Sequence, residues 1–501
     1  MYPTSLDYTN PGLLTMLMLL PFFGACCMFF VPVKEERFAR LFASIFAFSS
    51  LLLSCLIASD YTIKSSGYQF VEKLPFITNI GADYVVGIDG LSLVMLLLTT
   101  AICFLVILAS SSVHKNIRSY LGCILFLETG MIGTFIALDA LTFYVFWEIM
   151  LVPMYFIIGV WGGERRVYAA IKFVLYTAIG SILMLVAMVY VAYQSQLQFG
   201  QMTFYLGDWL RLSFSPTEQL YLFIAFALAF AIKIPVFPFH TWLPDAHVEA
   251  PTGGSVILAA VMLKMGVYGL VRYAIPLFPE GFTYCLPVIF LLGVVGIVLG
   301  ALFAWVQTDI KKLIAYSSVS HLGFCVVGLC AFNFDGIQGA LLQLVNHGVS
   351  TGALFLLVGV LYDRRHTRLI SDYGGLAKKV PHFATLFLIF TLSSIGLPLT
   401  NGFIGEFMVL AGSYQADKVY GLIAVSGVVL GALYMLSLYR RVVFGELDQA
   451  KNGELTDITF TERLVFAPLL VAVFALGLFP TLVLDLLEPT SRNLISEVGQ
   501  R

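Results

Sequence analysis

The most constraining feature of this sequence is a pair of lysines inside long apolar segments. Lys233 lies in AFALAFAIKIPVFPFHTW and Lys264 in GGSVILAAVMLKMGVYGLV. Each segment is long enough to cross a bilayer, where a central lysine costs about 2.5–3.5 kcal/mol on insertion scales. The carboxylates Glu148 and Glu406 lie in similar apolar surroundings. Ionisable groups inside a membrane usually line an ion or proton path, so the pattern indicates a subunit of a transporter or pump.

The composition supports a membrane protein. Of 501 residues, 59% are hydrophobic and 12% are charged, with a mean hydropathy of +0.91, whereas about 25% of the residues in soluble domains are charged. The net charge of -2 argues against a nucleic-acid partner. The 8 cysteines form no Cys-x-x-Cys pair, and the sequence contains neither a P-loop nor a strand followed by Gly-x-Gly-x-x-Gly. We therefore expect no metal, iron–sulfur or nucleotide cofactor on this chain.

Hydropathy predicts an all-α polytopic membrane protein with about fourteen transmembrane helices, because a spanning helix needs about 20 apolar residues. The predicted spans are 11–33, 38–59, 91–112, 119–138, 140–161, 170–194, 219–242, 255–275, 284–306, 311–332, 336–361, 382–411, 420–440 and 463–486.

Basic residues test this count, because cytoplasmic loops are enriched in Lys and Arg. On these spans, five adjacent basic pairs fall on one side of the membrane: Arg165–Arg166, Lys311–Lys312, Arg364–Arg365, Lys378–Lys379 and Arg440–Arg441. That side is predicted to be cytoplasmic, which places both termini on the other side. The loops HTWLPDAHVEAPT and YDRRHTRLISDYGGLAKK are expected to be ordered cytoplasmic connections, in which His247 and His366 have structural roles.

Two predicted helices are broken. The seventh contains Pro235 and Pro238, and the twelfth contains SSIGLPLTNGFIGEF. Proline removes a backbone donor, and unwound backbone survives at bilayer depth only where protein or water covers it. The breaks are five helices apart, an odd offset that makes these helices antiparallel. Broken helices at matching positions of inverted halves point to a transport site.

The predicted segments are therefore residues 1–118 (helices 1–3), 119–275 (a first five-helix repeat, helices 4–8), 276–445 (an inverted second repeat, helices 9–13) and 446–501 (helix 14).

Glu148 and Lys233 are the first candidate pair. No Lys or Arg lies within one turn of Glu148 in sequence, so its partner must come from another helix. A lysine binds its proton less tightly when buried and more tightly when a carboxylate approaches, so a lysine at a helix break can switch charge. Two alternatives stay open: Glu148 could be hydrated at a helix end, and the pair could be a structural salt bridge.

Five further residues complete the candidate set. Lys264 either faces a hydrated interior or bonds backbone carbonyls that a neighbouring helix break exposes. Glu406 either exchanges protons with one aqueous side or caps the second half of the broken twelfth helix. His240, His321 and His347 lie in helices seven, ten and eleven, near the buried lysines. Imidazole titrates near neutral pH and passes protons through both nitrogens, so these histidines are proton-relay candidates, although each could instead be a satisfied core residue.

A family resemblance is carried by five segments: FWEIMLVPMYF, KIPVFPFHTWLPDAHVEAPTGGSV, QTDIKKLIAYSSVSHLG, NHGVSTGALFLLVGVLYDRRHTR and NGFIGEF. Together they resemble the antiporter-like membrane subunits of the proton-pumping NADH:quinone oxidoreductase, respiratory complex I, from about residue 85 to 445. Two features favour one branch of this family. Glu406 stands where other members typically carry lysine, and the chain stops after the fourteenth span, without a long lateral helix.

The resemblance implies a proton channel made of two linked half-channels. Glu148 and Lys233 would form the switching pair, Lys264, His321 and His347 would continue the hydrated axis, and Glu406 would face the exit. NADH, FMN, iron–sulfur clusters and quinone would be bound by other subunits, with no cofactor on this chain.

The implied partners are other membrane subunits, including a paralogous antiporter-like subunit on either side, and membrane lipid. The clear asymmetry of basic residues between the loops favours a bacterial inner membrane, with an organelle inner membrane as the alternative. Two other functions remain open. The chain could be the large subunit of a multisubunit sodium/proton antiporter, but Glu406 favours the respiratory complex. It could also be a solute transporter, but the charges of the buried lysines would compete with a central substrate-binding site.

Overall fold

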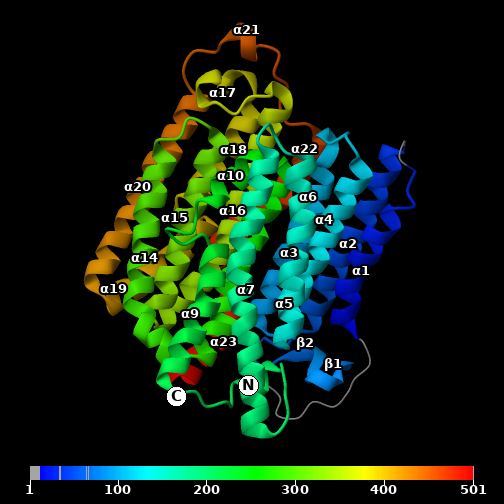
Figure 1. Cartoon of the computed structure of the whole chain (residues 1–501). Helices are drawn as coiled ribbons and strands as arrows, with labels where there is room; N and C mark the ends of the chain where they lie inside the picture. The colour runs from blue at the N-terminus through cyan, green and yellow to red at the C-terminus, as the bar shows by residue number, and fades with distance from the viewer. Residues whose placement is uncertain (1–11, 33–34, 64, 66, 500–501) are drawn as a thin grey trace.

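The computed structural model describes residues 12–32, 35–63, 65 and 67–499. Its helices run side by side in one bundle (Figure 1). At one end lie α17 (Leu376–Lys379) and α21 (Gln449–Asn452), which carry Lys378, Lys379 and Lys451. We call this the basic end. The positive-inside rule predicts that this end is cytoplasmic. The opposite end holds a short hairpin and α23 (Thr481–Gly499).

Eleven helical stretches among the described residues are long and apolar enough to cross a bilayer. They are α2 (Glu36–Asp60), α3 with η2 (Gly90–Ser112), α4 (Ile117–Ile136), α5 and α6 (Ala140–Trp161), α7 (Arg166–Phe199), α11 to α13 (Thr252–Leu277), α14 (Pro279–Trp305), α15 (Ile310–Cys330), α16 (Phe334–Arg365), α20 (Lys418–Val443) and α22 (Phe460–Leu478).

Shorter helices account for the other three predicted spans. The first corresponds to α1 (Leu13–Met28), although its predicted end residues, 11 and 33, lie outside the described residues. The seventh is α9 (Pro216–Lys233) followed by α10 (Trp242–Glu249), and the twelfth is α18 (Pro381–Ser394) followed by α19 (Asn401–Ala416). Both predicted helix breaks are therefore present.

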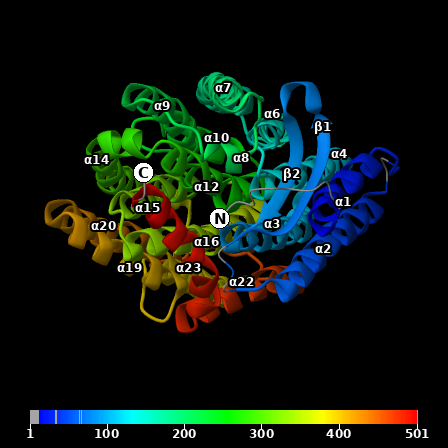
Figure 2. The same cartoon turned by 90° about the horizontal axis from the view of Figure 1, so that it is seen from below.

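The helices that carry most of the candidate residues lie at the centre of the bundle. The stretch Thr252–Leu277 is buried from Gly254 onward, and α15 and α16 are buried almost completely. Seen from below, α16 and α12 (Lys264–Gly269) lie inside a rim that includes α2, α7, α20 and α22 (Figure 2). Because lipid contacts the rim, polar groups on the central helices must find partners within the protein or in internal water.

Three features differ from the sequence-based prediction. Strands β1 (Gln69–Ile77) and β2 (Ala82–Ile88) form an antiparallel hairpin, with Leu74 opposite Tyr84, between the second and third predicted spans, where the sequence predicts no strand. The predicted last span, 463–486, ends at Leu478, and α23 is a separate helix after Pro480. The fifth span is divided at Met150 into α5 and α6, directly after Glu148. Pro153 lacks the N–H that would bond the Ile149 carbonyl, which explains the interruption.

Candidate functional site

Four titratable side chains from four helices form a connected series in the buried centre. Lys264 Nζ lies 2.6 Å from Nδ1 of His347, and the rings of His347 and His321 are 5.7 Å apart between centroids. His321 Nδ1 lies 3.0 Å from Oε1 of Glu406, where an N–H donates to the carboxylate oxygen. The series thus begins on α12, crosses α16 and α15, and ends on α19 beyond the second helix break. All four residues were candidates from sequence.

The backbone around Lys264 explains how a buried lysine is held. Residues 258–262 form a π-helical segment, η3, and Lys264 follows it at the start of α12. The ammonium group also donates to the carbonyl oxygen of Ala259. A π segment is a frequent feature of functional sites, and here it offers a carbonyl to the lysine on its own helix. This carbonyl belongs to the lysine's own helical stretch, whereas the sequence-based alternative placed the bonded carbonyls at a neighbouring helix break.

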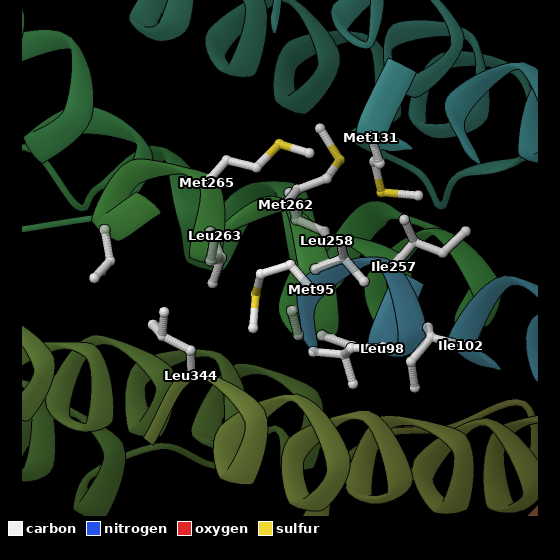
Figure 3. Close-up of a cluster of buried hydrophobic side chains, with 14 of the residues drawn as sticks. Met95, Leu98, Ile102, Met131, Ile257, Leu258, Met262, Leu263, Met265 and Leu344 are labelled. Atoms are coloured by element: carbon white, nitrogen blue, oxygen red, sulfur yellow. The ribbon is translucent and has the colours of Figure 1, made fainter. Parts of the chain in front are cut away.

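An apolar collar surrounds this helix. Figure 3 shows Leu258 and Leu263 on the side of Met95 of α3 and Leu344 of α16, while Met262 points toward Met131 of α4. These side chains are almost entirely buried. The close approach to the first helix break depends on Gly266, because a Cβ there would lie 2.7 Å from the carbonyl oxygen of Phe230 and 2.5 Å from Ile234. The collar excludes bulk water from the sides of the Lys264 site, which strengthens its electrostatic contacts.

Glu406 is held from two sides. Besides its contact with His321, its Oε1 accepts a hydrogen bond of 3.0 Å from Gln343, whose own Oε1 accepts one of 3.3 Å from Asn346. Gly396, in the break before α19, has a left-handed φ of +71°, and a Cβ there would lie 2.9 Å from Oε2 of Glu406. The break thus lets the backbone pass close to the carboxylate.

A small polar cavity of about 10 Å³ lies between the two imidazoles. Its lining includes His321, His347, Ser350 and Ser394, and the Ser394 hydroxyl lies 3.4 Å from Nε2 of His321. Nε2 of His347 is buried without a hydrogen-bond partner among the described residues. The cavity has room for about one water molecule, which is enough to connect the two rings.

Glu148 and Lys233 are neighbours, but they are not in contact. No ion pair within 4.0 Å joins them in the described part of the chain, although each acts electrostatically on the other. Lys233 Nζ instead lies 4.9 Å from the ring centroid of Trp147, and it has no hydrogen-bond partner among the described residues. A cation over an indole face is attracted by the ring quadrupole. In this conformation the candidate switching pair is open.

His240 lies apart from the connected series. Its ring stacks on Phe237 and Phe303, with centroids 5.5 and 6.1 Å away, and its Nδ1 is unbonded within the described structure. Nearby, Lys172 of α7 forms an ion pair of 2.7 Å with Asp245. No hydrogen bond in the described residues links His240 to Lys264 or Lys233. Among these residues, no group of three or more His, Cys, Asp or Glu side chains could hold a metal ion.

The comparisons with known proteins identify the family of this chain. A family model described as NADH:quinone oxidoreductase/Mrp antiporter, transmembrane, matches residues 137–433. NADH-quinone oxidoreductase subunit M of Rhodobacter capsulatus is 44% identical, covering 97% of this chain and 96% of that protein. The chain belongs to the subunit M family of NADH-quinone oxidoreductase. NADH-ubiquinone oxidoreductase chain 4 of Chondrus crispus is 40% identical, with 99% of each chain covered. This is the branch that Glu406 favoured.

Solved structures show the same fold. A chain of respiratory complex I from Thermus thermophilus with bound NADH superposes with a TM-score of 0.88 at 32% identity, covering 97% of this chain and all of that one. A chain of the Mrp complex from Dietzia sp. has a TM-score of 0.80 at 24% identity, covering 97% of this chain and 52% of that one. The second likeness shows the fold alone. The subunit M family and the Mrp chain thus share one architecture.

Sequence reasoning missed four polar residues of this subunit M structure. Gln343 and Ser394 contact the site, and Gln343 could have been found because it precedes Asn346 and His347 by three and four residues, on one helix face. By sequence, Lys311 is one of the basic residues of the predicted cytoplasmic side, and His247 lies in a predicted ordered loop. Both are buried, because α10, α15 and α16 pack together where hydropathy indicated a connection. No signal in the sequence distinguishes this burial.

Proposed function

We propose that this chain carries protons across the membrane as the M subunit of a respiratory NADH:quinone oxidoreductase, through an axis formed by Lys264, His347, His321 and Glu406. Two short contacts carry the proposal: Lys264 to His347, at 2.6 Å, and His321 to Glu406, at 3.0 Å. Both lie at the buried centre of the bundle, and the rings of the two histidines are 5.7 Å apart between centroids. Buried ionisable groups are costly and are kept where they line proton paths.

Each contact supports one proton transfer. The ammonium of Lys264 gives a proton to Nδ1 of His347, and the imidazolium releases one from Nε2. Water in the cavity between the rings carries it to His321, whose Nδ1 delivers it to the Glu406 carboxylate. Imidazole suits this role because it accepts on one nitrogen and donates from the other. Gln343 keeps the carboxylate oxygen oriented toward His321.

Glu148 and Lys233 act as the switch for this axis. When Glu148 approaches Lys233, the ion pair holds the charge on the lysine; when they separate, as here, the ammonium is held only by aromatic faces and favours giving up its proton. Moving one charge against 100 mV takes about 2.3 kcal/mol, a cost within the range that making and breaking one buried ion pair can supply. His240, beside the Lys172–Asp245 pair, serves as a relay group between the basic end and Lys233.

The wider assignments follow from the same proposal. Residues 119–275 and 276–445 are inverted repeats, each contributing one half-channel, with 1–118 and 446–501 as flanking helices. Paralogous antiporter-like subunits lie on either side. Electron transfer through NADH, FMN, iron–sulfur clusters and quinone takes place on other subunits, and this chain converts their signal into proton movement.

The test uses membranes from cells carrying the tagged chain. A native gel of solubilised membranes, stained for NADH dehydrogenase activity, should show the chain in a large active band. Inverted vesicles with Lys264→Met should then lose NADH-driven proton pumping, whereas Lys379→Met, an exposed lysine at the basic end, should not. A smaller complex without NADH activity, showing sodium-dependent proton exchange, would replace the proposal with the antiporter reading. Normal pumping in assembled Lys264→Met would refute the axis.

A further inference from the structure

An apolar groove lies between three helices that do not carry the proton axis. It has a volume of about 320 Å³ and is walled by α1, α4 and α6, which lie together at one edge of the bundle (Figure 2). The side chains that line it are mainly apolar, and they include Phe22 and Ala25 of α1, Gly122 and Phe126 of α4, and Val152 and Phe156 of α6. Its volume is within the range of ligand-binding pockets, which is about 300–1,000 Å³.

One cation stands at the mouth of the groove. Arg118, in the first turn of α4, is the only charged side chain among the described residues that line it. Its Nη1 donates hydrogen bonds of 3.1 and 3.0 Å to the carbonyl oxygens of Phe29 and Val31, just after α1. These bonds hold the guanidinium in place. No acidic side chain in the described part of the chain forms an ion pair with Arg118, and its Nε and Nη2 groups donate to none of the described residues.

The groove runs through most of one leaflet of the membrane. At its mouth, the indole N–H of Trp161 donates a hydrogen bond of 2.6 Å to the carbonyl oxygen of Lys115, and tryptophan is enriched at the level of the lipid headgroups. Phe126 follows Arg118 by eight residues on α4, which corresponds to a rise of about 12 Å. Half of the hydrocarbon core of a bilayer is about 15 Å thick. The groove therefore extends from the headgroup level at the basic end toward the middle of the bilayer.

This combination of features fits an anionic phospholipid. Apolar walls of leaflet depth suit an acyl chain, and a guanidinium with unused donors suits a phosphate, which it can bind through two hydrogen bonds. Basic pockets between helices on the cytoplasmic side bind anionic headgroups. The exposed Lys115 adds positive charge near the mouth, and the carboxylate of Glu36, at the start of α2, is shared by Arg40 and His114. A zwitterionic headgroup would bring its own cation to this basic site.

We propose that the groove binds one anionic phospholipid from the leaflet at the basic end. Arg118 holds its phosphate, and one acyl chain lies between α1, α4 and α6. The site shares no residue with the series from Lys264 to Glu406. This proposal and the proposed function can therefore fail or stand separately.

The test uses the whole complex, purified through the tagged chain and reconstituted into phosphatidylcholine bilayers. One preparation contains a small fraction of phosphatidylglycerol with a photoreactive diazirine on an acyl chain, and another contains phosphatidylcholine with the same group. After illumination, mass spectrometry locates the cross-linked residues, and labelling in the groove is expressed as a share of all lipid cross-links to the chain. The phosphatidylglycerol probe should label Phe126 and Phe156 about fivefold more than the phosphatidylcholine probe, the effect of about one basic residue on an anionic headgroup.

Two variants change the site at different places. In Arg118→Gln, groove labelling by the phosphatidylglycerol probe should fall about fivefold, to the level of the phosphatidylcholine probe. In Gly122→Leu, both probes should lose their groove labelling, because a Cβ at Gly122 lies no closer than 3.5 Å to Met28 and leaves room for a side chain that fills the groove. This variant keeps the bonds of Arg118. Arg166→Gln, at an exposed arginine of α7, is the control and should label like wild type.

The outcomes separate lipid recognition from its alternatives. Equal groove labelling by the two probes in wild type would show bulk lipid without headgroup selection and would overturn the proposal. Absence of groove labelling, with cross-links elsewhere on the chain, would show that a neighbouring subunit covers the groove, and it would also overturn the proposal. If Arg118→Gln fails to assemble because the end of α1 is released, Gly122→Leu decides: groove labelling that persists in this variant would refute the assigned position of the acyl chain.

Discussion

Nζ of Lys264 lies 2.6 Å from Nδ1 of His347, although 83 residues separate them in sequence. The distance is that of a strong charge-assisted hydrogen bond. It joins the helix with the π segment to the most buried part of α16, and it fixes which nitrogen of His347 faces the lysine. The other nitrogen is then free to serve the cavity shared with His321.

Replacing His347 with glutamine should break this link. The amide can still accept from Lys264, which also keeps its bond to the Ala259 carbonyl, so we expect assembly to survive. An amide cannot bind and release a proton, so pumping should fall at least about tenfold. The measurement is NADH-driven acidification of inverted vesicles, normalised to the assembled complex on a native gel. His382→Gln, at an exposed histidine, is the control; equal pumping by the two variants would contradict the role of His347.

Glu148→Gln should abolish the switch while the subunit still assembles. The carboxylate forms no ion pair with Lys233 in this conformation, and the amide oxygen of glutamine can still accept the hydrogen bond from Ser181, so the substitution should cost little stability. Without its charge, the ammonium of Lys233 is no longer drawn toward α5, and pumping coupled to quinone reduction should fall strongly. Glu164→Gln, an exposed carboxylate near the basic end, should behave like wild type. Lys233→Ala should reproduce the Glu148→Gln phenotype, and its absence from the membrane would instead indicate a structural salt bridge.

The sequence was most informative where a local signal interrupts a long apolar segment. Lys233 and Lys264 stand out against such segments, and Pro235 and Gly396 mark the two breaks, because each of these signals is decided within a few residues. The burial of His247 and Lys311 depends on how distant helices pack over a short connection, which hydropathy does not encode. The β1–β2 hairpin was missed because Glu72, Lys73 and Pro75 interrupt the apolar alternation of its first strand.

Arg272 holds the last helix against the bundle at the end opposite the basic end. It forms an ion pair of 2.6 Å with Asp89, whose second oxygen accepts a hydrogen bond of 2.8 Å from Thr490 of α23. Arg272→Met leaves the Asp89 carboxylate without its cation, and breaking a buried pair typically costs about 3–5 kcal/mol. We expect a clear fall in the melting temperature of the solubilised complex and faster proteolysis of α23. Lys451→Met, which removes an exposed pair with Asp448, should change neither.

Asp139 gives a prediction that depends on pH. Its Oδ1 accepts hydrogen bonds of 2.9 and 3.0 Å from the N–H groups of Leu141 and Thr142, while Oδ2 has no partner among the described residues. Burial raises the pKa of Asp139 to about 7, although the capping bonds lower it. In an unfolded chain the pKa of an aspartate is about 3.9. Between about pH 4 and 7 the folded state therefore binds more protons, and this residue makes stability fall as pH rises.

Asparagine keeps the capping oxygen of Asp139 and does not titrate. Asp139→Asn should therefore melt at a higher temperature than wild type at about pH 8, and the difference should shrink toward about pH 5. The effect is measured by thermal melting of the solubilised protein across this pH range. The other titratable groups are the same in wild type and variant, so their contributions cancel in the difference between the two melting temperatures. Parallel melting curves at every pH would show that Asp139 is not the titrating group.

Gly396 tests how closely the second helix break controls Glu406. An alanine at this position would have to adopt a φ of +71°, a left-handed conformation that costs about 1–2 kcal/mol. Its Cβ would lie 2.9 Å from Oε2 of Glu406. We expect Gly396→Ala to lower the melting temperature and to slow pumping, because the carboxylate must move relative to His321 and Gln343. The matched control is Gly296→Ala in α14, where no neighbouring atom lies within 4 Å of a Cβ; replacing a helical glycine there should stabilise by about 0.5–1 kcal/mol. If both variants pump and melt alike, the position of Glu406 does not depend on the backbone at Gly396.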